Sequence, residues 1–367
     1  MSSLYDIVRV GKVFSEVLED NVRIDIIPLQ SYVQWDEITS ELDTDVYFYS
    51  KYVLSFDSYS EGLGFAVSVK SPNGARYFEP FRVRKIDIDG FEDYCDVSSE
   101  YGYAGPVCTG DEIFVDFVLN ALRSFFKRCG VVSVFTRYHP LLKNEKIVAK
   151  YRNIINCNPT VSIDTSLPFN EILANLDLKK RSNYKRAVKK GTSVRYGNES
   201  DISKFYDLYM QSMQHANASE FYILSEDFFR NTLSNLRNNS FMLIAEFEGI
   251  AVGASIFLFS KHMMHYHFSG KNFNDPNASK ANGTTVIICE AAKIASEMGI
   301  GEFHLGGGVG GASNDSLFNF KKDFSSQTRN FYISKDIENL PVYLSICNKR
   351  EIDMDRETFF PAYRVKR

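Results

Sequence analysis

The segment TTVIICEAAKIASEMGIGEFHLGGG, residues 284–308, decides the fold class of this chain. Apolar residues at helical spacing within it predict a helix over residues 284–298 that buries one face: Ile287, Ala291, Ile294 and Met298. Gly299 ends that helix, and the strand EFHL, residues 302–305, then enters a triple glycine. The strand MMHYHF, residues 263–268, precedes the helix. A helix that joins two neighbouring strands favours a parallel pair within a mixed sheet.

Further upstream, residues 241–247 and 250–259 are apolar runs that flank Glu248-Gly249. A glycine turn between two such runs predicts an antiparallel hairpin. The second half therefore has the order hairpin, strand, loop, helix and strand.

The first half of the chain repeats this order without repeating the residues. The runs 64–69 and 75–83 flank the turn SPNG at 71–74, and a turn-rich segment, YGYAGP, follows at 101–106. Residues 111–129 have helical spacing, and a strand begins at residue 131. The two copies predict an α/β (α+β) protein in which each repeat is a mixed, largely antiparallel sheet flanked by helices.

A length of 367 residues fits two domains. We expect a first domain over residues 1–165, a second over 166–345, and a docked tail over 346–367 that carries large apolar residues. The segment 167–191 is predicted to be one helix that enters the second domain and stops at Gly191.

The composition is that of a globular protein, with 44% hydrophobic and 24% charged residues, and it excludes disordered and coiled-coil classes. The net charge is 17 − 24 = −7 up to Thr165 and 25 − 22 = +3 after it, which gives the total of −4. This balance argues against a dedicated DNA-binding protein. No apolar run has the length of a membrane span and no secretory signal is evident, so a cytoplasmic location is expected.

The six cysteines form no C-x-x-C motif, so they predict neither a metal site nor a redox pair. Cys289, within an apolar run, is expected to be a buried thiol.

Six segments together are similar to a known family. They are SEYGYAGP (99–106), FTRYHPL (135–141), RSNYKRAVKKG (181–191), QHANASEFY (214–222), HYHFSG (265–270) and LGGGVGGASNDSLFNFKKDF (305–324). The chain resembles the tandem-GNAT acyltransferases of the FemABX type, including relatives associated with cell-wall and surface-polysaccharide biosynthesis. The resemblance implies two tandem GNAT-like domains, with the donor on the second, the acceptor side on the first and a cleft between them.

The resemblance also implies the reaction, which is transfer of an acyl group from an activated donor to an amine. We expect acyl-CoA as the co-substrate and an amino-sugar, nucleotide-sugar or polysaccharide precursor as the acceptor. Two alternatives remain open: aminoacyl-tRNA-dependent transfer to a cell-wall peptide, and a non-catalytic module that binds a glycan or nucleotide.

The donor is expected at the loop that contains Lys280, Asn282, Gly283 and Thr284, which matches in outline the GNAT loop that holds the CoA pyrophosphate. Glycines there allow close backbone approach, and a helix N-terminus offers free N–H groups. The resemblance adds Gly306, Gly307 and Gly308 as donor-binding residues. The alternative is an ordinary loop in which Asn282 or Thr284 caps the helix.

Lys321 and Lys322 are the expected source of positive charge at the reacting carbonyl. In FemABX proteins the matching F-K segment places a lysine there, where an ammonium stabilises the developing negative charge. Lys321 is the better match because it directly follows Phe320; both lysines could instead be solvated.

His265 and His267 are candidate proton acceptors because a histidine titrates near neutral pH. Strand alternation predicts that they share one face, with Tyr266 and Phe268 on the other, and that His304 lies on the neighbouring strand. No further ligand has zinc spacing, so no metal is expected. Hydrogen-bonded histidines without a catalytic role are the alternative.

Residues 179–195 contain eight basic and no acidic residues. Such a run favours an anionic partner such as a nucleotide-sugar diphosphate, CoA or tRNA, although a solvated helix face would have the same composition. The resemblance singles out Arg181 as a substrate-binding residue.

Seven further residues are candidates for acceptor binding: Tyr101, Tyr103, Arg137, His139, His215, Asn217 and Tyr222. Aromatic rings stack on sugars and arginine binds phosphate or carboxylate with two hydrogen bonds, whereas structural packing of the same residues is the alternative.

Overall fold

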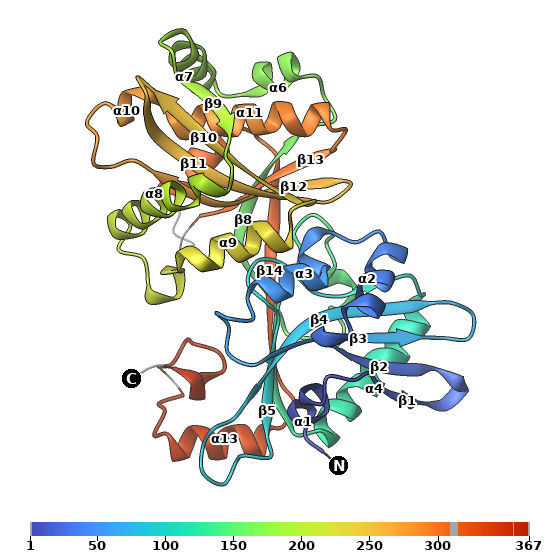
Figure 1. The fold of residues 1–367 in the computed structure, drawn as a ribbon. Helices are drawn as coiled ribbons and strands as arrows, with labels where there is room; N and C mark the ends of the chain where they lie inside the picture. The colour runs from blue at the N-terminus through green and yellow to red at the C-terminus, as the bar shows by residue number, and fades with distance from the viewer. Residues whose placement is uncertain (1, 309–314, 355, 366–367) are drawn as a thin grey trace. The chain divides into compact units, whose positions relative to one another are not determined.

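A computed structural model describes residues 2–308, 315–354 and 356–365 of the chain (Figure 1). It divides into two compact units. The first comprises residues 1–157 and 331–367, and the second comprises residues 158–330. The second unit therefore differs from the expected second domain, residues 166–345: it begins at residue 158, and residues 331–345 belong to the first unit.

The first unit is built on a sheet in the order β1-β2-β3-β4-β5-β7-β14. Its strands are β1 (Phe14–Val17), β2 (Arg23–Pro28), β3 (Leu63–Lys70), β4 (Arg76–Lys85), β5 (Cys95–Ser98), β7 (Val131–Arg137) and β14 (Thr328–Ile337), and the short β6 (Val107–Cys108) pairs with β4. All neighbours are antiparallel except β5 and β7. The hairpin predicted around SPNG is confirmed, with Lys70 opposite Arg76.

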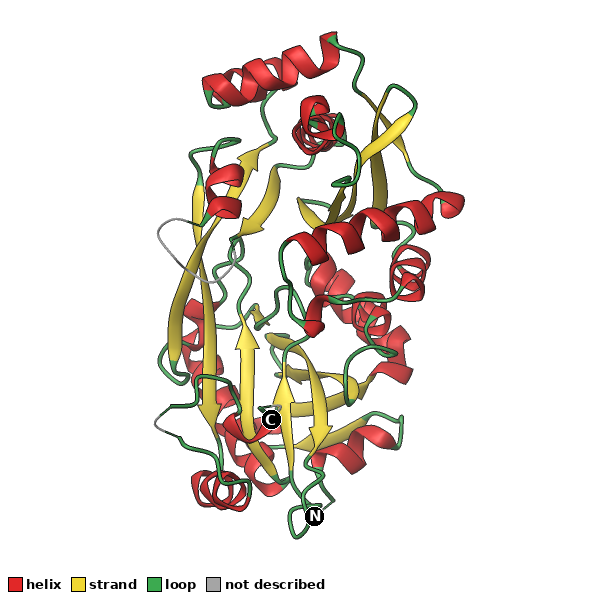
Figure 2. Ribbon diagram, turned by 90° about the vertical axis from the view of Figure 1, so that its left-hand side faces the viewer, coloured by secondary structure: helices red, strands yellow, loops and turns green. Residues whose placement is uncertain are grey.

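Helices cover both faces of this sheet (Figures 1 and 2). They are α1 (Leu4–Arg9), α2 (Tyr32–Glu41), α3 (Ser50–Ser55), α4 (Glu112–Arg128), α5 (Glu145–Val148) and α13 (Leu340–Lys349). Helices α1 and α4 pack on one face, where strand residues such as Ile26 and Val67 form a core with Val118 and Leu122. The other face contacts α2 through an edge-on contact between Trp35 and Phe78.

The second unit repeats this arrangement with the order β8-β13-β12-β11-β10-β9. Its strands are β8 (Ile154–Asp164), of which residues 158–164 lie in this unit, β9 (Ser193–Tyr196), β10 (Ser240–Phe247), β11 (Ile250–Phe259), β12 (Met263–Lys271) and β13 (Glu302–Gly307). Only β12 and β13 are parallel. Each unit therefore contains one helix that joins two parallel strands, α4 between β5 and β7 and α11 (Gly283–Glu297) between β12 and β13. This confirms the predicted fold class.

Helices also lie on both faces of the second sheet. They are α6 (Phe169–Asn175), α7 (Leu178–Lys189), α8 (Ile202–His215), α9 (Glu226–Asn235), α10 (Ala278–Ala281), α11 and α12 (Ser316–Lys322). Helices α6, α7 and α11 share one core, in which Ile172, Ala187 and Ile287 are buried. Figure 1 shows α8 and α9 on the opposite side of these strands from α11.

The prediction of one helix over 167–191 is wrong, because α6 ends at Asn175 and α7 begins at Leu178. Leu176 has extended backbone angles, and the Asp177 carboxylate accepts hydrogen bonds from the Lys179 and Lys180 backbone N–H groups. An aspartate that caps a new helix competes with continuation of the preceding one.

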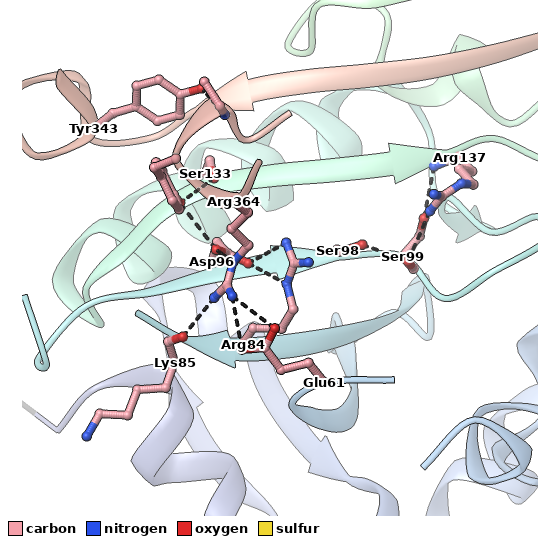
Figure 3. Close-up of polar contacts among 12 residues, drawn as sticks. Glu61, Arg84, Lys85, Asp96, Ser98, Ser99, Ser133, Arg137, Tyr343 and Arg364 are labelled. Carbon is pink, nitrogen blue, oxygen red and sulfur yellow. Dashed lines mark hydrogen bonds and ion pairs between the residues drawn. The ribbon is translucent and has the colours of Figure 1, made fainter. Parts of the chain in front are cut away.

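The C-terminal tail packs on the first unit through a buried carboxylate (Figure 3). Asp96 is completely buried and accepts hydrogen bonds from the guanidinium groups of Arg84 and Arg364. Arg364 also pairs with Glu61, and the Tyr363 hydroxyl lies 3.0 Å from that of Ser133. Charge pairing and aromatic packing therefore hold residues 362–364 to β4, β5 and β7.

The six cysteines are free thiols, and Cys289 is buried as expected. Burial raises its pKa strongly, so it is a structural thiol. Among the helices of the described ranges, none combines the length and apolar content that crossing a bilayer requires.

Candidate functional site

Strands β12 and β13 separate at their carboxyl ends. Their parallel ladder runs from Met263 opposite Glu302 to His265 opposite His304. Beyond that point β12 continues beside β11 as far as Lys271, whereas β13 continues beside β8 as far as Gly307. Helix α11, which connects the two strands, begins at this same end. In α/β proteins, ligands bind at the carboxyl ends of such strands.

Lys321 lies at this divergence. It is 7% exposed, its ammonium donates a 2.7 Å hydrogen bond to the Gly307 carbonyl, and its Nζ is 5.9 Å from the centre of the Tyr266 ring. Burial lowers the pKa of Lys321 to about 8, against the opposing attraction of Asp315. At neutral pH the side chain is therefore still mostly charged, in a place where little water screens that charge.

Helix α12 presents Lys321 because both of its ends are fixed. At the start, the Asp315 carboxylate accepts a hydrogen bond from the Phe318 N–H. At the end, Asp323 pairs with Lys180 of α7 at 3.2 Å. The Lys180 ammonium also lies over the rings of Phe320 at 3.9 Å and Phe324 at 4.8 Å. Lys180 is buried, and this burial lowers its pKa.

Lys322 is exposed on the same helix. The two neighbouring lysines are thus in different surroundings: Lys321 bonds to the end of β13, whereas Lys322 faces solvent. Of the pair, Lys321 is the one placed beside the divergent strands.

The predicted distribution of side chains on β12 is wrong because the strand contains a bulge. Ile256 of β11 pairs with Phe268 and the next residue, Phe257, pairs with Tyr266, so His267 is an extra residue. Tyr266 packs toward Phe257 on the α11 side, while Phe268 packs against Phe229 of α9. A bulge shifts the alternation of side chains by one position.

His265 and His304 are buried beside this bulge, whereas His267 on the bulge is partly exposed although its Nε2 atom is buried. The rings of His265 and His304 are 5.5 Å apart and each residue is 1% exposed. Burial, together with the charge of His265, lowers the pKa of His267 to about 3. His267 is therefore neutral at physiological pH and a weak base, which argues against its predicted role as proton acceptor.

The loop before α11 has the features of an anion site. Asn282 occupies the position before the helix with a left-handed φ of 50°, and its side chain makes no capping hydrogen bond to the first turn. A Cβ at Gly283 would lie 2.8 Å from Val252, so glycine is needed for the helix to approach β11. Thr284 follows in the first turn, and Lys280 is exposed, with its ammonium 3.3 Å from the Asn277 side chain. Asn282 thus holds the N-cap position that the alternative predicted, but its side chain makes no capping hydrogen bond.

The glycine run lies beside the Lys321 site. Gly306 has a φ of 77° at a bulge where β13 pairs with β8, and Gly307 accepts the Lys321 hydrogen bond. A Cβ at Gly308 would lie 2.1 Å from the Asp315 carboxylate, so glycine permits this approach. The middle of the motif, residues 309–314, lies outside the described residues.

The basic run is distributed around α7. Five of its residues form an exposed cationic face: Lys179, Lys185, Arg186, Lys189 and Lys190. Arg181 instead donates a 3.3 Å hydrogen bond to the Ala174 carbonyl and links α7 to α6, while Arg195 pairs with Asp201 and Glu246. Arg181 therefore has a structural contact in addition to its expected role.

The candidates in the first unit gather around one aromatic cluster. Tyr103 lies edge-on to Tyr47 at 5.3 Å and to His139 at 5.7 Å. His139 is completely buried: its Nε2 is 3.0 Å from Asp45, and its Nδ1 accepts from the backbone N–H groups of residues 141 and 142. It orders the loop that follows β7.

Tyr101 and Arg137 remain partly exposed in the first unit. The Tyr101 carbonyl accepts from the Tyr52 hydroxyl, and Arg137 lies over the Phe135 ring and hydrogen-bonds Ser99 (Figure 3).

His215, Asn217 and Tyr222 lie at and after the end of α8 in the second unit. His215 stacks on Phe273 at 4.0 Å, Asn217 has a left-handed φ of 47°, and Tyr222 is 41% exposed. They form a polar and aromatic surface on the α8 side of the sheet.

The sequence reasoning did not single out Tyr266, Lys180 or Asp315. Strand alternation predicted only which face of the strand Tyr266 lies on, and Lys180 was one of eight basic residues in the run 179–195. The signal for Asp315 is its position before α12, since aspartate is a common helix cap.

Comparisons with known proteins agree with this geometry. Residues 179–322 match the family described as Acetyltransferase (GNAT) domain. No curated protein matches the sequence.

Three solved structures show the same fold at low identity. A crystal structure of FemX has a TM-score of 0.64 and 13% identity, covering 81% of this chain and 93% of that chain. A conserved protein of unknown function from Bacteroides thetaiotaomicron has a TM-score of 0.53 and 9% identity, covering 89% and 100%. The C-terminal domain of a putative lysylphosphatidylglycerol synthetase from Agrobacterium fabrum has a TM-score of 0.50 and 15% identity, covering 83% and 92%.

Proposed function

We propose that this chain, an acyltransferase whose second unit carries a GNAT domain, transfers an acyl group from acyl-CoA to the amine of an amino sugar. The acceptor would be a nucleotide-linked sugar or a polysaccharide precursor. The observation that carries the proposal is the buried Lys321 ammonium at the divergence of β12 and β13.

The chemistry requires stabilisation of a negative oxygen. The amine lone pair attacks the thioester carbonyl carbon, a C–N bond forms, and the carbonyl electrons move onto oxygen. Collapse of this intermediate breaks the C–S bond and releases a thiolate, while the nitrogen loses a proton. An ammonium held in a water-poor site stabilises the oxyanion more strongly than it would in water. Lys321 has this role in the proposal.

Donor binding is assigned to the start of α11. Its first turn lacks a side-chain cap, and the helix N-terminus has partial positive charge, which suits a pyrophosphate. Lys280 lies on the preceding α10 and adds positive charge. Asn282 and Gly283 give the loop its close approach to the strands.

Stabilisation of the leaving group is assigned to Tyr266. Burial raises the pKa of Tyr266, and its hydroxyl bonds with the side chains of Ser269 and Ser255. The phenol therefore keeps its proton and can donate a hydrogen bond to the departing thiolate. The amine would lose its proton to solvent or to a group on the acceptor, because His267 is too weak a base.

Acceptor binding is assigned to exposed aromatic and basic side chains. In the first unit Tyr101 and Arg137 are partly exposed, and such groups bind sugar faces and phosphates. Tyr222 and His215 offer a similar surface in the second unit.

The deciding experiment measures transfer with defined donors. Wild-type protein is incubated with acetyl-CoA and longer acyl-CoAs and with UDP-linked amino sugars, and free CoA and acylated product are quantified by mass spectrometry. We expect stoichiometric release of CoA and formation of amide, both slowed at least about 10²-fold in Lys321→Met. Transfer at an undiminished rate in Lys321→Met would overturn the role of Lys321, and the absence of transfer with every acyl-CoA would overturn the donor.

A second candidate donor is aminoacyl-tRNA, which the cationic face of α7 favours. Five basic side chains on one exposed face would attract a polyanion, and their binding would weaken steeply with salt. Charged tRNA supplied in place of acyl-CoA tests this candidate in the same assay. Transfer from tRNA that is lost in Lys185→Glu/Lys189→Glu would support it, whereas transfer from acyl-CoA alone would exclude it.

A further inference from the structure

A cavity of about 550 Å³ lies in the first unit, on the sheet face that carries α2. This volume is within the range of small-molecule sites. The floor is formed by polar side chains of three strands and the wall by the start of α2. The lining residues that matter are Arg23, Asp25, Ser68, Lys70, Arg76 and, on the helix side, Ser31, Gln34 and Glu37.

Three cations stand in a row across the floor. Arg23 of β2 lies opposite Lys70 of β3, and Lys70 lies opposite Arg76 of β4. Residues opposite each other on antiparallel strands project to the same face, and like charges in such positions destabilise the sheet. Arg23 and Lys70 are exposed, so water screens part of this repulsion, but the row gives the floor of the cavity a positive charge.

The two outer cations have counter-charges, whereas the middle one has none among the described residues. Arg23 pairs with Asp25 at 2.8 Å, and Arg76 pairs with Glu41 at 3.3 Å. Across the ranges that the structure describes, no carboxylate forms an ion pair with Lys70. The centre of the floor thus has a positive charge between two guanidinium groups, each of which still has donors available.

The wall adds a second source of positive potential. Ser31 stands at the N-cap position of α2, where no side chain caps the helix and the first turn has no acidic residue. The Gln34 amide lies one turn into the helix. Glu37, one further turn along, is the acidic group that faces the cavity without an ion-pair partner in the described part of the chain.

We propose that this cavity binds a small hydroxyl- or amine-bearing molecule through a phosphate or carboxylate group. The oxyanion would bind Lys70, with Arg23 and Arg76 beside it and the start of α2 above it. Glu37 would accept a hydrogen bond from the hydroxyl or ammonium group at the other end of the ligand. This site is separate from the Lys321 site and goes beyond the proposed transfer reaction, so either can fail without the other.

The test is calorimetric titration of the full chain with glucose 6-phosphate, inorganic phosphate, citrate and glucose as separate probes. We expect saturable binding of glucose 6-phosphate, weaker binding of phosphate and none of glucose. Lys70→Gln should weaken binding at least about tenfold, the loss expected for one charge-assisted hydrogen bond. If citrate binds more tightly than the phosphates and the same variant weakens it, the oxyanion is a carboxylate.

A matched lysine variant serves as the control, and thermal stability gives a second readout. Lys85→Gln changes an exposed lysine at the other end of β4 and should leave binding unchanged. Because Lys70→Gln also relieves repulsion within the row, it should raise the Tm of the unliganded protein while lowering affinity. Equal binding by both variants, or no saturable binding of any oxyanion at millimolar concentration, would overturn the site.

Discussion

The Lys321 ammonium donates a 2.7 Å hydrogen bond to the carbonyl of Gly307, the last residue of β13. This contact places a charge carried by a short helix at the end of a strand that has just separated from its parallel neighbour. The same bond orients the ammonium, and among the described residues its other two N–H groups have no second hydrogen-bond acceptor, so they can bind a ligand.

Loss of this charge should act mainly on the chemical step. Lys321→Met keeps the apolar stem of the side chain, and we expect kcat to fall about 10²–10³-fold, the usual loss when one oxyanion donor is removed. Lys322→Met, on the exposed neighbour, should change kcat less than about twofold. Steady-state kinetics with saturating donor and acceptor measure both, and equal effects of the two variants would contradict the assignment.

The activity should decline in alkaline solution as Lys321 loses its proton. Since burial lowers its pKa to about 8, kcat should fall as pH rises through that value. Lys321→Arg should abolish this decline because arginine stays charged, even if its kcat is lower. A pH profile of kcat that is identical in wild type and in Lys321→Arg would refute this reading.

The contribution of Lys321 to the free energy of unfolding should rise with pH, whereas kcat should fall. The pKa of Lys321 in the folded state is about 8, below its ordinary value of 10.5. Between these pH values the unfolded chain holds more protons at this position, so the contribution of Lys321 to the free energy of unfolding rises with pH. Denaturant titrations of wild type and Lys321→Met, compared from pH 7 to 10.5, should diverge in this direction.

Lys180 should behave as a positioning residue for Lys321. Lys180→Met removes the contacts with Asp323, Phe320 and Phe324, and we expect a loss of about 1–2 kcal/mol in the free energy of unfolding. It should also lower kcat and shift the pKa read from the pH profile, which a purely structural role would not do. Lys185→Met, on the exposed face of the same helix, is the control.

The start of α11 can be tested with a charge that affects folding and binding in opposite ways. Thr284→Asp puts a carboxylate in the first turn, which stabilises a helix by about 0.3–1 kcal/mol through its dipole. The same carboxylate should repel a pyrophosphate and raise the KM for acyl-CoA at least about tenfold. A higher Tm together with an unchanged KM would show that the donor binds elsewhere.

The tail contact should contribute strongly to the stability of the first unit. Asp96→Ala leaves Arg84 and Arg364 without their shared carboxylate in a largely buried place, and removing one partner from such a pair costs about 3–5 kcal/mol. Asp89→Ala breaks an exposed pair with Lys349 and should cost less than about 1 kcal/mol. Chemical denaturation of the full chain distinguishes the two.

The sequence predicted secondary structure best where a single local rule, such as helix periodicity or turn chemistry, determines the conformation. The periodicity of residues 284–298 predicted α11, and the turn SPNG predicted the β3–β4 hairpin, because helix amphipathicity and turn chemistry are local properties. The order of elements then predicted the parallel pair of β12 and β13, whereas β5, the parallel partner of β7, was not identified from the sequence. The choice of Lys321 over Lys322 came from the resemblance, and their different burial fits it.

The errors arose where two local rules compete or where pairing is long-range. Asp177 interrupts a helical pattern by capping α7, and strand alternation fails at His267 because β12 contains a bulge. The partners of Lys180 come from α12, well over a hundred residues away, and no local pattern predicts them. The row of Arg23, Lys70 and Arg76 likewise cannot be predicted from the sequence, because it depends on the register of three strands.

The first unit is discontinuous in sequence, because the second unit is inserted between its residues 157 and 331. Strand β7 pairs with β14, whose residues 333–337 are synthesised only after the whole of the second unit, residues 158–330. Within the described residues, the second unit has β8 to β13 by residue 307, its α12 lysine by residue 322 and its part of β14 by residue 330. A nascent chain that has emerged from the ribosome as far as residue 330 would therefore carry a complete second unit on a first unit that still lacks its last strand.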